Sequence, residues 1–87
     1  MNIGLTLRKI RKIKDLPIKY IAYVSGTSVS NIGLAETAKL PRQESLMRHC
    51  NALKIPIAAV LLHTVNEDEI PPEHIDSFRK LKEDILK

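Results

Sequence analysis

Aliphatic side chains recur every three or four residues along most of the chain, which is the spacing of one face of an α-helix. Ile3, Leu7 and Ile10 define the first such segment, and strand signals are absent. Prolines, glycines and polar clusters interrupt the pattern. It predicts helices over residues 3–14, 17–25, 28–36, 42–54, 56–64 and 72–86. We therefore expect an all-α protein.

In two of these helices, the pattern also predicts which side chains face inward. Those expected to do so in the fourth are Leu46, Met47, Cys50 and Leu53, and those in the last are Ile75, Phe78, Leu81, Ile85 and Leu86. Between the fifth and sixth helices, the segment NEDEIPP is expected to be a polar linker that ends in proline.

The segment from Ile18 to Ala35 has the residues that a helix-turn-helix requires. Two short helices that cross closely need a small residue at the crossing, and Ala22 supplies it. Gly26 suits the turn because glycine adopts positive φ without strain. Thr27 or Ser28 is expected to cap the following helix. The expected inner face consists of Ile21, Val24, Ile32 and Ala35. An ordinary αα-hairpin also favours a small residue and a glycine, so this segment alone leaves both interpretations open.

Charge is divided unevenly between the two parts of the chain. Residues 1–55 contain ten Lys or Arg and three acidic residues, a balance of +7, whereas residues 56–87 have a balance of −3. This division is typical of a polyanion-binding domain followed by a separate C-terminal element. Taken alone, the charge fits a solvated basic outer face of the first helix equally well, where Arg8, Lys9, Arg11, Lys12 and Lys14 are expected.

Several functional classes find no support in the sequence. No apolar run approaches the roughly 20 residues of a membrane span, and the N-terminus lacks the features of a signal peptide, so we expect a cytoplasmic protein. Cys50 is the single cysteine and is expected to be buried. The spacing of His49, His63, His74 and Cys50 matches no zinc pattern, and no nucleophile has a base signalled by the sequence. We expect no enzymatic activity and no bound cofactor, metal or small-molecule ligand.

The first 61 residues resemble the XRE-type helix-turn-helix family of phage lambda repressor and Cro. The matching segments are IGLTLRKIR at 3–11, IAYVSGTSVSNI at 21–32, Glu36, Pro41, and LMRHCNALKIPIAAVL at 46–61. The resemblance implies a five-helix, lambda-repressor-like DNA-binding domain over residues 1–65. Residues 66–87 then form an acidic linker and a short C-terminal amphipathic helix.

The same resemblance implies that residues 28–36 form the recognition helix in the major groove of double-stranded DNA. The DNA-binding residues implied are Lys19, Ser28, Val29, Ser30, Asn31, Leu34, Lys39 and Arg42, with the lysines and the arginine on phosphates. Where the family usually has glutamine and a polar reader, this chain has Ile18 and Val29, so direct readout is expected to be weak and to favour A/T pairs. Gly33 is expected to lower helix stability and to allow close approach to the DNA backbone.

The expected function is that of a transcriptional regulator, a small repressor of phage, plasmid or mobile-element type. The alternative is a protein-interaction module, such as an antitoxin or anti-repressor, that grips its partner through Ile18, Val29, Leu34 and the C-terminal helix.

The apolar band IAAVLLH at 57–63 is wider than a helix buried on one side needs. We therefore expect a homodimer on a pseudo-palindromic operator, with Ile57, Ala58, Ala59, Leu62 and Phe78 at its interface. The alternative is a monomer in which Ile75, Phe78 and Leu81 cover the band.

Overall fold

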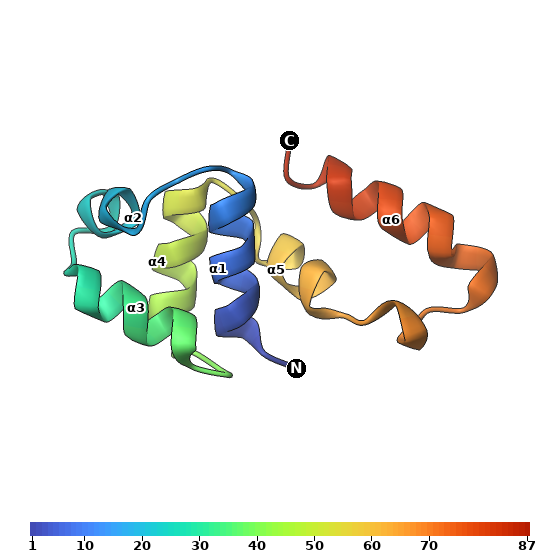
Figure 1. Cartoon of the computed structure of the whole chain (residues 1–87), viewed down its shortest axis with the longest axis horizontal. Helices are drawn as coiled ribbons and strands as arrows, with labels where there is room; N and C mark the ends of the chain where they lie inside the picture. The colour runs from blue at the N-terminus through green and yellow to red at the C-terminus, as the bar shows by residue number, and fades with distance from the viewer.

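The computed structural model describes all 87 residues and is entirely helical, which confirms the all-α prediction. Its α-helices are α1 (Ile3–Ile13), α2 (Ile18–Ser25), α3 (Val29–Thr37), α4 (Gln43–Leu53), α5 (Ile57–Thr64) and α6 (Ile75–Asp84). Figure 1 shows α1 and α4 side by side at the centre, α2 and α3 at one end of the molecule, and α6 at the other. The chain is thus a helix-turn-helix-like domain followed by a C-terminal helix. No helix combines the length and apolar character needed to span a membrane.

The helix boundaries differ from the predicted ones mainly near the C-terminus. The predicted helix 72–86 is divided into a 3₁₀ turn (η2, Pro72–His74) and α6, which ends at Asp84. Pro72 begins this turn, where its missing amide hydrogen is not needed, and the His74 amide donates to the Pro71 carbonyl at 2.9 Å, which closes the turn in 3₁₀ form. The polar linker contains a second 3₁₀ turn (η1, Glu67–Glu69), capped at Asn66. Pro17 precedes α2 in extended conformation and does not enter its first turn.

The core lies where α1 meets α4 and α5. Its largest fully buried side chains are Leu7, Ile10, Ile21, His49, Cys50, Leu53 and Val60. Two residues of the first domain that were predicted to face inward lie on its surface: Val24 is 48% exposed and Met47 is 40% exposed. Helix α2 is only two turns long and faces the core through a narrow stripe around Ile21 and Ala22, so Val24 falls outside it.

The N-terminus of α1 is joined directly to the end of α3. The amides of Ile3 and Gly4 donate to the carbonyls of Lys39 and Ala38 at 2.8 and 3.0 Å. These amides have no partner within their own helix, so the residues that follow α3 supply one. A Cβ at Gly4 would run into the carbonyl oxygens of Ala38, Ala35 and Glu36. The close approach of α1 to α3 therefore depends on glycine at this position.

Helix α6 folds back on the first domain at its C-terminal end. Ile85 and Leu86 pack against the core. The Lys14 ammonium donates to the Leu86 carbonyl at 3.2 Å, and His63 Nε2 lies 2.9 Å from the Lys82 carbonyl oxygen. Leu81 was expected to face inward but is 49% exposed.

Candidate nucleic-acid interface

The turn between α2 and α3 has the predicted conformation. Gly26 ends α2 with φ 67° and ψ 34°, which confirms that the turn uses a left-handed residue. The Thr27 amide donates to the Ala22 carbonyl at 3.0 Å. Ser28 caps α3, because its Oγ accepts a hydrogen bond from the Asn31 amide at 3.1 Å. This turn fixes α3 relative to α2.

A buried cluster of Arg11, Glu36 and His49 fixes α3 on its other side. The Arg11 guanidinium donates to both carboxylate oxygens of Glu36, with Nε at 2.8 Å and Nη2 at 3.1 Å. Arg11 Nη1 also donates to the carbonyl of Leu16 at 2.9 Å. The Arg11 side chain is 12% exposed and that of Glu36 is 4% exposed. One charged group thus connects α1, α3 and the loop before α2.

His49 brings α4 into the same cluster. Its Nε2 lies 3.2 Å from Glu36 Oε2, and the side chain has no exposed surface. Burial lowers the pKa of His49 below its ordinary value, although the neighbouring Glu36 carboxylate opposes the shift. Because Arg11 already neutralises this carboxylate, we assign a neutral imidazole that donates from Nε2. Its Nδ1 is then a buried acceptor without a partner.

The sequence pattern did not reveal this cluster. Arg11 was expected on the outer, solvated face of the first helix, and that expectation is wrong because its guanidinium turns toward Glu36. One available signal was that Glu36 occupies the same helix face as Ile32 and Ala35, where a lone carboxylate requires a cationic partner.

The state of His49 predicts how stability depends on pH. The pKa of His49 is depressed in the folded protein, so the unfolded chain binds the proton first as the pH falls. The stabilisation is fully present above the unfolded pKa of about 6.5 and decreases below it until the folded pKa is reached. Urea unfolding at a series of pH values should show a steeper decrease for the wild-type protein than for His49→Gln. His74→Gln, at an exposed position, is the matched control and should follow the wild-type curve; equal curves for all three proteins would contradict the assignment.

The outward face of α3 is small and partly apolar. Ser30, Leu34 and Thr37 form its exposed stripe, and Leu34 is 68% exposed. Val29 is 44% exposed at the start of the helix. Asn31 lies beside this stripe, toward α4, and its Nδ2 donates to Thr27 Oγ1 at 2.8 Å. The side-chain oxygen of Asn31 is not used in this hydrogen bond.

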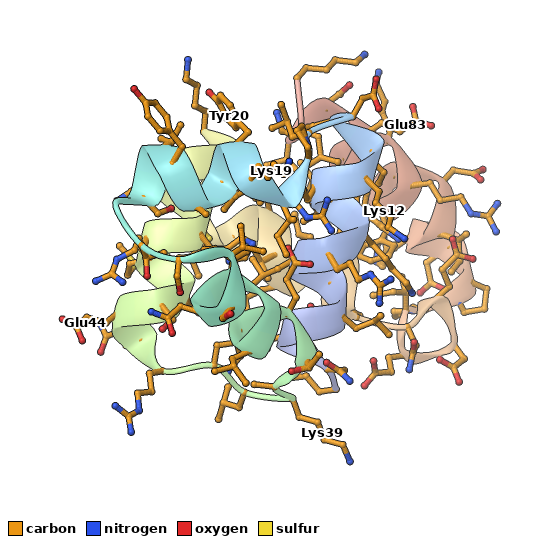
Figure 2. The ribbon with its side chains drawn as sticks, turned by 60° about the vertical axis from the view of Figure 1, so that its left-hand side comes forward. Lys12, Lys19, Tyr20, Lys39, Glu44 and Glu83 are labelled. Carbon is orange, nitrogen blue, oxygen red and sulfur yellow. The ribbon has the colours of Figure 1, made fainter.

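Basic side chains surround this face. Lys19, Lys39 and Arg42 are exposed, as contact with phosphates would require. In Figure 2, which brings this end of the molecule forward, Lys19 lies above α3 and Lys39 below it, while Lys12 lies to the side on α1. These cations come from α2, from the segment after α3 and from α1.

Arg48 is a further exposed cation here, and the sequence pattern did not indicate it. It belongs to α4, but Arg48 and Asn31 both line a groove of about 380 Å³ between α3 and the start of α4. No signal in the sequence places a residue of the fourth helix beside the third, because that proximity arises from the packing of α3 on α4.

Burial of Glu36 against Arg11 removes one charge of each sign from the surface of this domain, which remains predominantly basic. Of the three acidic residues in positions 1–55, only Asp15 and Glu44 are exposed, whereas nearly all the lysines and arginines are.

Gly33 has open space where a Cβ would lie, so nothing in the chain itself approaches it closely.

The residues expected at a dimer interface divide into two groups. Ala59 is completely buried and Phe78 is 9% exposed within the single chain, so the expectation that they offer contact surface to a second chain is wrong. Ala58 is exposed, while Ile57 and Leu62 are half-buried. Leu61, which was not expected there, adds a 47% exposed side chain.

Cys50 is buried as expected, and burial raises the pKa of its thiol. No group of three or more His, Cys, Asp or Glu side chains is arranged to hold a metal ion.

Comparisons with protein-family models, with curated proteins and with solved structures find no match to this chain.

Proposed function

We propose that the protein is a transcriptional regulator that binds double-stranded DNA with α3 in the major groove. The observation that carries this proposal is the exposed stripe of α3 set among basic side chains from three other parts of the fold. Cations beside an exposed helix neutralise phosphates and orient the helix, while the helix surface meets the base edges. The expected site of action is the cytoplasm.

Few side chains on this surface are available to contact the base edges. Ser30 and the free side-chain oxygen of Asn31 offer hydrogen bonds, and Leu34 offers an apolar contact for thymine methyl groups. Arg48 lines the same groove as Asn31, and we expect it to add a contact to a phosphate or a guanine on this side of α3. Weak direct readout that favours A/T pairs follows, with affinity supplied mainly by the phosphate contacts.

The protein is proposed to act as a homodimer through the outer face of α5, formed by Ala58, Leu61 and Leu62. A two-fold dimer would present its recognition helices about 34 Å apart, one turn of DNA. Its operator would then be pseudo-palindromic.

The competing function is binding of a partner protein, which the 68% exposure of Leu34 favours. The surface expected for it does not form as a unit. Ile18 is half-buried against the core, and α6 lies at the opposite end of the molecule from α3 (Figure 1). A partner bound at Val29 and Leu34 would therefore not reach the C-terminal helix without spanning the domain.

Selection of bound sequences from random DNA duplexes tests the proposal. We expect enrichment of a site with two related half-sites and an affinity that falls steeply between about 50 and 200 mM salt. Replacing Lys19, Lys39 and Arg42 together by glutamine should reduce the slope of log affinity against log salt by about three. Removal of one cationic contact reduces that slope by about one.

The matched control is Lys80→Gln, which removes one charge from α6, far from α3. It should leave the slope and the affinity unchanged. Failure to enrich any duplex would sink the proposed function and favour the protein partner, and a selected site with a single half-site would contradict the dimer.

A further inference from the structure

A cavity of about 630 Å³ lies on the side of the protein away from α3, where α6 folds back on the first domain. It is bordered by the end of α1 (Ile13 and Lys14), by His63 of α5 and by Arg79, Lys82 and Leu86 from the C-terminal segment. Its volume is within the range of about 300 to 1,000 Å³ typical of small-molecule sites. No ligand pocket was expected from the sequence.

The side chains around this cavity are mostly cationic. Lys14, Arg79, Lys82 and Lys87 border it, against one carboxylate, that of Glu83. This is the reverse of the surrounding segment, since residues 56–87 carry a net charge of −3. A helix that folds onto a core normally presents apolar side chains to it. Here α6 buries Phe78 but also presents Arg79 and Lys82 beside it, and a cavity remains between these cations and the domain.

The partners of these cations identify the one that is available. Arg79 is paired with Glu67 at 2.7 Å, and this hydrogen bond lowers the pKa of the Glu67 carboxyl. Lys14 is held by the Leu86 carbonyl, and Lys87 lies 3.5 Å from Asp84. The Lys82 ammonium forms no hydrogen bond or ion pair within the chain and lies 5.4 Å from the centre of the Phe78 ring. Its charge helps to lower the pKa of the Glu67 carboxyl, but that carboxylate is already paired with Arg79. Lys82 is therefore free to meet an external anion.

The cavity also has an apolar part. Ile13 is 62% exposed and borders it together with Leu86. The alkyl stems of lysine and arginine side chains extend such a surface while their charged ends stay in contact with water. A molecule that fills this space would meet an aliphatic surface at one end and an ammonium group at the other.

We propose that this cavity binds a small amphipathic organic anion, with its charged group at Lys82 and its apolar portion against Ile13 and Leu86. A ligand in this position touches α1, α5 and α6 at once, so it holds the C-terminal helix against the domain. This inference concerns a site between the first domain and the C-terminal end of α6, away from α3, and does not rest on the proposed DNA binding.

Titration of the full chain with octanoate, followed by amide NMR shifts, tests the proposal without DNA. Saturable shifts should appear at Ile13, Lys14, His63, Lys82 and Leu86, with a dissociation constant of about 1 mM or tighter. Octanol, which lacks the charge, and inorganic phosphate, which lacks the chain, should each bind at least about tenfold more weakly. Equal binding of either probe, shifts centred elsewhere, or no saturable octanoate binding would each overturn the proposal.

Substitution locates the anion-binding group. Lys82→Gln should weaken octanoate binding about tenfold, because a charged hydrogen-bond partner is lost. Lys80→Gln removes the same charge from the same helix outside the cavity and should bind octanoate as the wild-type protein does. An equal effect of the two substitutions would show that net charge, and not this cavity, attracts the anion.

Discussion

Replacing Glu36 by alanine should lower the free energy of unfolding by about 3 to 5 kcal/mol, since it leaves a nearly buried guanidinium without its counter-charge. Glu36 receives two hydrogen bonds from Arg11 and lies 3.2 Å from His49, and its side chain is only 4% exposed. Loss of the carboxylate would also remove the side-chain contacts that it makes from α3 to α1 and α4. Urea denaturation followed by far-UV circular dichroism measures the change.

The second ion pair of this kind in the protein supplies a matched control. Arg79 binds Glu67 with similar geometry, at 2.7 and 2.8 Å, but both side chains are largely exposed. Solvent screening and side-chain entropy cancel most of the gain from such a pair. Glu67→Ala should therefore change stability far less than Glu36→Ala, and similar losses in the two variants would contradict the importance of burial.

A companion substitution separates the charge from the packing. In a double variant, Arg11→Met with Glu36→Leu, both charged groups are replaced by apolar side chains of comparable size. This variant should be more stable than Glu36→Ala alone, because no unpaired charge remains in the interior. A double variant no more stable than the single one would show that the packing of α1 on α3, and not the charge, is lost.

Gly4→Ala is expected to destabilise the protein by about 2 to 3 kcal/mol, although alanine is the better helix former. Its Cβ would overlap the carbonyl oxygens of Ala38, Ala35 and Glu36, which are backbone atoms and cannot rotate away. Helix α1 would have to separate from the end of α3 and lose the two hydrogen bonds that Ile3 and Gly4 make to Lys39 and Ala38. Thermal and urea unfolding would both report this loss.

Gly33→Ala is the natural comparison, since it makes the same chemical change in another helix. Nothing lies within 4 Å of the Cβ position at Gly33, and its φ is not positive. Alanine there should raise the free energy of unfolding by about 0.5 to 1 kcal/mol, the difference in helix propensity. A loss of stability at Gly33, or a gain at Gly4, would contradict the packing described here.

Much of the candidate interface could be predicted because it depends on local rules. The left-handed turn at Gly26 and the cap at Ser28 follow from the conformational preferences of those residues within a few positions of the chain. The exposure of Lys19, Lys39 and Arg42 follows from the helix period and the loop. The sequence pattern placed Arg11 on the wrong face and did not indicate Arg48, because the surroundings of both residues come from helices distant in the sequence.

The sequence by itself determined the helices, their approximate limits and the turn between α2 and α3, because periodicity, proline and glycine act over a few residues. Only the tertiary structure decided which of the charged residues lie inside. It paired Arg11 with Glu36 across 25 positions, turned Val24 and Met47 to the surface, and opened a cation-lined cavity beneath α6. These outcomes depend on the angles and distances between helices, which no local pattern encodes.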